Sequence, residues 1–155
     1  MATHGNGKVQ RSQIRKGVDA TMAIALVYLT CLVVFLGMDA IWLGAASGAL
    51  YTSVLGDLML AQFRITPAVL FYLLQIAGIL VFVLPRARQS AIPWAAFWFG
   101  ALFGICTYGT YDLTNQAVLR VWTWPLTVID MAWGACVTGI ASLAGAFVER
   151  KLKRA

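Results

Sequence analysis

Three aspartates, Asp39, Asp112 and Asp130, lie in stretches that are otherwise apolar and long enough to cross a membrane. Placing a charged side chain at the centre of a bilayer costs about 2.5–3.5 kcal/mol on the most lenient insertion scale. Ionisable residues in such segments usually face a bundle interior or a cavity, where they mark functional sites. A carboxyl group placed there could hold a cation, carry a proton or act as a general acid or base. The three aspartates therefore predict a functional site inside the membrane.

The composition of the chain indicates an all-α integral membrane protein, which supplies the helices that would carry these residues. Of its 155 residues, 61% are hydrophobic and 12% are charged, whereas soluble domains are about 25% charged. The net charge of +6 comes mostly from the two ends of the chain. Basic residues beside membrane spans are typical of anchors on anionic lipid. The expected partners are therefore membrane lipids, and no nucleic acid is expected.

The apolar runs predict a bundle of four transmembrane helices in one domain, residues 18–148. A basic mobile tail, residues 1–17, precedes this domain, and a basic C-terminal tail, residues 149–155, follows it. The predicted spans are residues 19–46, 66–84, 93–119 and 125–148.

Prolines mark the starts of the last three spans, because proline suits the first turn of a helix. They are Pro67, Pro93 and Pro125, and Thr66 is expected to cap the second span. Between spans one and two, apolar residues of 47–65 recur at helical spacing. This pattern predicts a short amphipathic helix in the membrane interface, and the alternative is an extension of span one.

The distribution of Lys and Arg predicts the orientation of the bundle. The N-terminal tail, the loop with Arg86 and Arg88, and the C-terminal tail hold most of the positive charge. Both termini are therefore expected in the cytoplasm. Pairs of small residues four positions apart, such as Gly100 with Gly104, predict close packing of the helices without indicating which helices touch.

With this orientation, the polar side chains of all four spans fall at a similar depth. Asp39 and Asp112 lie about 26–28 Å from the cytoplasmic starts of two outward-running helices. Asp130 and Tyr72 each lie about 8 Å from the outer end of an inward-running helix. The sequence therefore predicts an outward-opening polar pocket with aromatic walls. Its predicted ligand-binding residues are Asp39, Trp42, Tyr72, Gln75, Tyr108, Tyr111, Asp112, Asn115, Asp130 and Trp133.

Three neighbouring carboxylates require a counter-charge or bound protons. Oxygen ligands without histidine favour a hard cation such as Ca²⁺, Mg²⁺ or Na⁺, or a proton, over zinc. Arg64 and Arg120 are candidate counter-ions, because both belong to the outer face. The chain has no haem, flavin, nucleotide or zinc motif, so the cofactor stays open.

Four motifs resemble an uncharacterised bacterial family, catalogued as a domain of unknown function. They are Asp39-Ala-Ile-Trp42-Leu-Gly, Phe71-Tyr72, the run from Tyr108 to Asn115 that contains Tyr-Asp-Leu-Thr-Asn, and Asp130-Met-Ala-Trp133-Gly. Members of that family are small predicted four-helix proteins of the inner membrane. The resemblance implies this topology and location, covers nearly everything between the two tails, and implies no established activity.

Three functions remain open from the sequence. The first is the binding, with or without transport, of a small ligand, cation or proton; a transport pathway through so narrow a bundle would need a homodimer. The second is an enzyme that acts on a lipid or isoprenoid, with Asp39, Asp112 and Asp130 as candidate catalytic residues. The third is a structural or accessory subunit whose polar residues join helices through hydrogen bonds.

Overall fold

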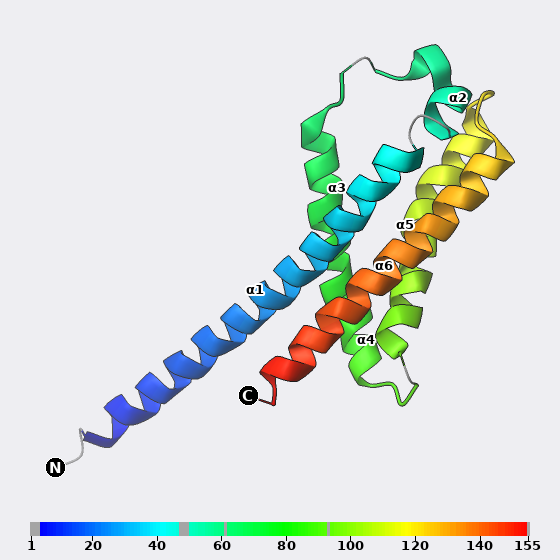
Figure 1. Cartoon of the computed structure of the whole chain (residues 1–155). Helices are drawn as coiled ribbons and strands as arrows, with labels where there is room; N and C mark the ends of the chain where they lie inside the picture. The colour runs from blue at the N-terminus through cyan, green and yellow to red at the C-terminus, as the bar shows by residue number, and fades with distance from the viewer. Residues whose placement is uncertain (1–3, 47–49, 61, 93, 155) are drawn as a thin grey trace.

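The protein is an all-helical bundle in a computed structural model, which describes residues 4–46, 50–60, 62–92 and 94–154, with side chains from residue 19 onward. No strand occurs in these ranges. The four long helical segments lie side by side (Figure 1). The elements are α1 (His4–Ala46), α2 (Thr52–Leu55), the 3-10 turn η2 (Gly56–Leu58), α3 (Ile65–Gly78), the π turn η3 (Ile79–Val83), α4 (Leu84–Arg88), α5 (Ala95–Val118) and α6 (Trp124–Leu152).

The long segments alternate in direction. The N-terminal end of α1, the α4–α5 connection and the C-terminal end of α6 lie at one end of the bundle, and α2 lies at the other (Figure 1). Helix α1 begins at His4, within the segment predicted to be a mobile tail. The predicted short helix between spans one and two is present as α2 and η2, although Ser47 to Ala49 lie outside the described residues.

Three helical segments are long and apolar enough to cross a membrane. They are Asp19–Ala46, Ile65–Arg88 and Trp124–Leu152, with mean hydropathies of 2.3, 2.4 and 1.6. Helix α5 does not join them by this measure, because its second half carries Tyr108, Tyr111, Asp112, Asn115 and Gln116. This half of α5 is the part that carries predicted pocket residues.

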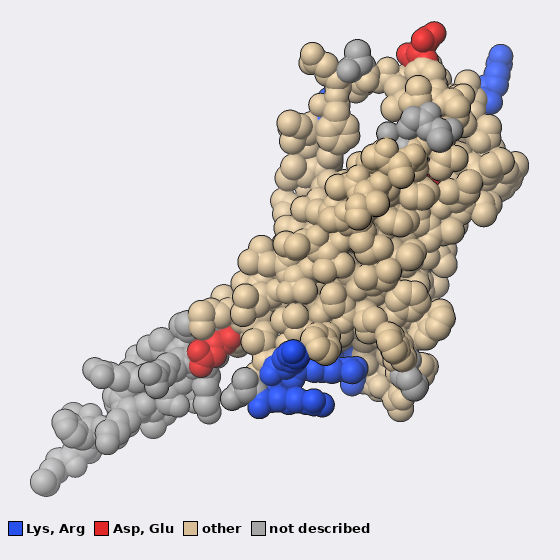
Figure 2. All heavy atoms as spheres, in the orientation of Figure 1, with Lys and Arg blue, Asp and Glu red and all other residues tan. Residues whose placement is uncertain are grey.

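The outer surface of the bundle carries many exposed apolar side chains, as a surface in contact with lipid does. Large apolar side chains such as Ile41, Leu74 and Val118 are more than 70% exposed. The face shown in Figure 2 has an uncharged middle, and the charged side chains gather at its two ends. Because water would penalise such a surface over this length, the distribution supports a membrane location.

Helix α6 packs against both α5 and α1, and small residues make this close approach possible. A side chain on Gly104 of α5 would overlap the backbone carbonyl of Gly134 in α6, and one on Gly139 would meet Phe97 of α5. The predicted pair Gly100 and Gly104 therefore joins α5 to α6, where Gly100 meets Ser142 and Gly104 meets Gly134.

The segment from α3 to α4 continues past the predicted end of the second span. Pro85 does not end the helix, which runs on to Arg88. Proline removes a backbone donor and crowds the carbonyl four residues before it, Val81, which lies in the π turn η3. The wider π turn accommodates this crowding and keeps the segment continuous.

The other proline predictions have mixed outcomes. Pro125 lies in the first turn of α6, as predicted, and Pro93 lies outside the described residues. Thr66 does not cap α3, which begins one residue earlier at Ile65, with Arg64 in the cap position and no side-chain hydrogen bond there.

Replacing Gly104 with alanine should destabilise the bundle, because the new methyl group would overlap the backbone of α6. Overpacking of this kind costs about 1–3 kcal/mol. The matched control is Gly37→Ala in α1, where nothing lies near the added atom. Thermal unfolding in detergent should show a lower Tm for Gly104→Ala alone, and equal Tm values for the two variants would contradict this packing.

Candidate functional site

A cavity of about 550 Å³ lies toward the α2 end of the bundle. Helices α1, α3, α5 and α6 form it, together with the segment between α1 and α3. We call it the polar pocket, and Asp39, Trp42, Leu43, Tyr51, Phe63, Pro67, Ala68, Phe71, Tyr72, Thr107, Tyr108, Tyr111 and Asp130 line it.

Asp39 of α1 is the most fully bonded carboxylate in the polar pocket. Tyr72 of α3 donates a hydrogen bond from its hydroxyl to Asp39 Oδ2, at 2.6 Å. Trp133 of α6 donates from Nε1 to Asp39 Oδ1, at 3.2 Å. The Trp133 ring stacks on Trp42, with centroids 4.6 Å apart and planes 7° from parallel. Asp39 thereby joins three helices and fixes one aromatic wall.

Asp130 of α6 is held by a residue from outside the long helices. Tyr51 donates from its hydroxyl to Asp130 Oδ1, at 2.6 Å. Burial, together with this hydrogen bond, raises the pKa of Tyr51. The phenol therefore remains a neutral donor at physiological pH. This bond engages one carboxylate oxygen, so Asp130 Oδ2 can accept a further donor from a ligand.

Asp112 of α5 has a different environment. Its side chain is fully buried, and neither carboxyl oxygen has a hydrogen-bond partner in the described part of the chain. Asp130 lies close enough to interact electrostatically with both Asp112 and Asp39. The structure therefore places Asp39 and Asp130 on the wall of the polar pocket, and Asp112 near Asp130 behind the lining.

In the part of the chain whose side chains are described, no basic residue forms an ion pair with these acids. Among the described residues, the ion pairs are those of Glu149 with Arg88 and with Lys153. Arg64 and Arg120, the candidate counter-ions, form no ion pair in the described ranges. The same residues contain no group of three His, Cys, Asp or Glu side chains arranged to hold a metal ion. Negative charge here must be met by protons or by a ligand.

Aromatic rings make up much of the remaining wall. Tyr108 and Tyr111 of α5, both predicted ligand-binding residues, line the polar pocket. Phe71 meets Tyr108 edge to face, at 6.0 Å between centroids. Trp42 Nε1 is buried without a hydrogen-bond partner in the described part of the chain. The pocket therefore combines acids with aromatic faces.

Gln75 and Asn115 lie beyond the lining of the polar pocket. Gln75 donates from Nε2 to the hydroxyls of Thr107, at 3.2 Å, and Thr138, at 3.1 Å. This network joins α3, α5 and α6 one turn below Tyr72. Asn115 is half-buried near Tyr111. Both residues adjoin the pocket without facing it.

Sequence reasoning missed Tyr51, Phe63 and Thr107. Tyr51 belongs to the segment in which apolar spacing predicts a short interfacial helix, yet its hydroxyl donates a hydrogen bond to Asp130. The available signal was the type of residue, because a buried phenol usually has a hydrogen-bond partner. Neither Phe63 nor Thr107 carried a comparable signal.

The same truncation at two of the aspartates should have different effects on stability. Asp39→Ala leaves the Tyr72 hydroxyl and the Trp133 indole without their acceptor, whereas Asp112→Ala removes no hydrogen bond. Each unsatisfied buried polar group costs about 1–3 kcal/mol. Unfolding in detergent should therefore give the lower Tm for Asp39→Ala. A larger loss in Asp112→Ala would show that Asp112 has a structural partner.

Comparison with known proteins identifies the family. Residues 24–147 match the family described as predicted membrane protein (DUF2177), and this segment contains all three aspartates. No curated protein and no solved structure matches the chain. The match confirms the resemblance inferred from the sequence and agrees with the three apolar helices. Because it spans most of the chain, the protein belongs to the DUF2177 family of predicted membrane proteins.

Proposed function

We propose that this membrane protein binds a small organic cation in the polar pocket, through a protonated amine or a quaternary ammonium group. The observation that carries the proposal is the convergence of Asp39, Asp112 and Asp130 without a basic partner among the described residues. A cation in the pocket would lower the repulsion among these carboxylates. Asp130, with one oxygen left by Tyr51, is the proposed direct contact.

The aromatic lining favours an organic cation over a bare metal ion. Positive groups are attracted to the faces of Trp and Tyr by about 0.5–2 kcal/mol. Trp42, Tyr108 and Tyr111 offer such faces beside Asp39 and Asp130. The volume of about 550 Å³ falls in the range of small-molecule sites. A dehydrated metal ion would instead need several oxygen ligands around one point.

The proposed topology has four spans, both termini in the cytoplasm and the polar pocket opening outward. Helix α5 packs against α6 and runs in the opposite direction, which supports it as the fourth span. The positive-inside rule supports the orientation. The family resemblance supports the inner membrane of a bacterium.

The half of the bundle away from the polar pocket favours a binding function over a complete transport pathway. Beyond Gln75, the buried side chains include Ile76, Ile79, Val83 and Leu84. Among the described residues, Ser142 adds a buried hydroxyl beyond Gln75, but no buried carboxylate or basic side chain continues the polar pocket along the bundle interior. Transport would therefore need a second conformation or a homodimer.

A lipid- or isoprenoid-directed enzyme is the second candidate, and Asp112 is the observation that favours it. A carboxyl group without hydrogen-bond partners does not join helices, so the scaffold role explains Asp39 better than Asp112. Its place beside Asp130 suits proton exchange between two acids and a substrate.

Cation binding is tested by thermal stability of the purified protein with choline and with its neutral isostere 3,3-dimethylbutanol. A ligand at one hundred times its Kd stabilises the native state by about 2.7 kcal/mol. Choline should raise the Tm, the neutral isostere should not, and Asp130→Asn should abolish the shift. Asp57→Asn is the control, because Asp57 is exposed in η2 and does not line the pocket. Equal shifts with both compounds would contradict the proposal.

The enzyme candidate predicts a separate dependence on Asp112. Incubation of the protein with a total membrane lipid extract, followed by mass spectrometry, should reveal a product that disappears in Asp112→Asn. The same variant should fold with an unchanged Tm, since no hydrogen bond is lost. Absence of any product with the native protein would remove this candidate and leave the binding function.

A further inference from the structure

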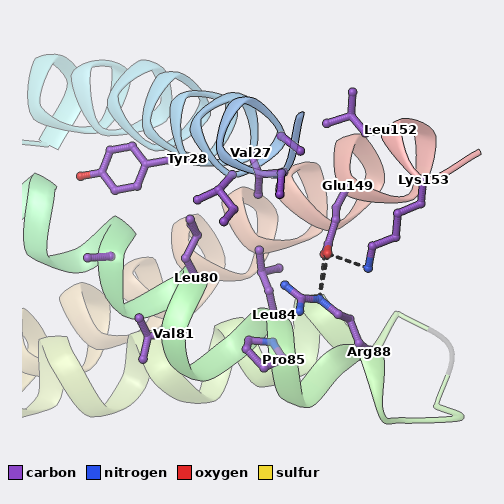
Figure 3. Close-up of a pocket in the computed structure, with 14 residues that line it drawn as sticks. Val27, Tyr28, Leu80, Val81, Leu84, Pro85, Arg88, Glu149, Leu152 and Lys153 are labelled. Atoms are coloured by element: carbon purple, nitrogen blue, oxygen red, sulfur yellow. Dashed lines mark hydrogen bonds and ion pairs between the residues drawn. The ribbon is translucent and has the colours of Figure 1, made fainter. Parts of the chain in front are cut away.

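We propose a second binding site, for an anionic phospholipid, at the opposite end of the bundle from the polar pocket. A hollow of about 720 Å³ lies there between α1, the α3–α4 segment and α6 (Figure 3). We call it the lipid slot. The lipid slot shares no lining residue with the polar pocket, so it is independent of what that pocket binds.

The walls of the lipid slot are apolar along most of its length. Val27 of α1 faces Leu80 and Leu84 across the hollow (Figure 3). Ala20 and Ala23 of α1 also line it, and their short side chains leave room beside the helix. From Ala20 to Tyr28 the slot follows about 12 Å of α1. This length suits part of an acyl chain.

One end of the lipid slot carries a small charged cluster. Glu149 of α6 lies 2.9 Å from Arg88 Nε and 2.9 Å from Lys153 Nζ. The side chains of Arg88 and Lys153 are 49% and 63% exposed, whereas that of Glu149 is 15% exposed. Two accessible cations thus cover one shielded acid, and the rim presents net positive charge. Arg88 uses Nε for Glu149, and a guanidinium has further N–H donors for a phosphate oxygen.

The apolar walls and the basic rim together match one kind of ligand, which must have both an apolar part and an anionic group. A free phosphate would leave the apolar wall uncovered, and a neutral apolar ligand would not use the rim. A phospholipid with net negative charge joins an anionic headgroup to acyl chains in the arrangement that the slot offers. The basic rim also lies at the end predicted to be cytoplasmic, where anionic lipids attract Lys and Arg.

The test is native mass spectrometry of delipidated protein, titrated with phosphatidylglycerol or with phosphatidylcholine of identical acyl chains. The native protein should prefer phosphatidylglycerol. The double variant Arg88→Gln with Lys153→Gln should weaken the binding of phosphatidylglycerol roughly thirtyfold, because it removes two positive charges that attract the anionic headgroup. The matched control is Lys151→Gln with Arg154→Gln, which removes the same charge at the same end without altering the lining of the slot.

A third variant tests the apolar part of the slot. Ala23→Phe places a ring in the hollow and leaves the charged rim intact, so it should also weaken phosphatidylglycerol. Glycerol phosphate, the headgroup without acyl chains, should not compete. Equal binding of the two lipids, equal loss in the control double variant, full binding to Ala23→Phe or effective competition by glycerol phosphate would each overturn the proposal. Thermal unfolding of all variants separates lost binding from lost folding.

Discussion

The polar end of this bundle is shaped by negative charge that, among the described residues, has no ion pair with Lys or Arg. The carboxylates of Asp39 and Asp130 instead accept hydrogen bonds from uncharged donors, which are the phenols of Tyr72 and Tyr51 and the indole of Trp133. Each donor comes from a different segment from its acceptor. The aspartates therefore determine how α1, α3, α6 and the segment before α2 meet, whether or not a ligand is present.

The rest of the bundle makes this meeting possible through close backbone packing. Gly104 and Gly134 bring α5 against α6, which places Tyr108 over the surface of α6. A larger residue at either glycine would move α5 and, with it, the wall that holds Tyr108 and Tyr111. Small residues in the middle of the bundle and aromatic residues at one end are therefore parts of one arrangement.

Much of the site followed from counting residues along helices. Once four spans were assigned, a fixed rise per residue placed Asp39, Tyr72, Asp112 and Asp130 near one level, and the structure brings them together. Counting residues along a helix does not give the direction in which each side chain points around the helix axis. It therefore could not show that Gln75 turns toward Thr138, or that Trp133 lies behind Asp39 rather than across the cavity.

The sequence patterns could not predict how the chain is arranged between the long helices. Tyr51 contacts Asp130 across 79 positions of sequence because the residues around α2 lie at the same end of the bundle as Asp130. Helical periodicity reports which residues share a face, but it does not report what that face covers. The predicted end of the second span at residue 84, just before Pro85, was similarly wrong, because a π turn can relieve the crowding that would terminate an ordinary helix.

That π turn introduces a fixed angular offset between the two halves of the α3–α4 segment. Each residue advances an α-helix by about 100°, so the wider turn shifts the faces that follow it relative to those that precede it. Tyr72 and Gln75 lie before Ile79–Val83, and Leu84 and Arg88 lie after it. The side chains at the two ends of this continuous segment therefore point in directions that differ from those of an unbroken α-helix, and closing the π turn would rotate Leu84 and Arg88 relative to Tyr72 and Gln75.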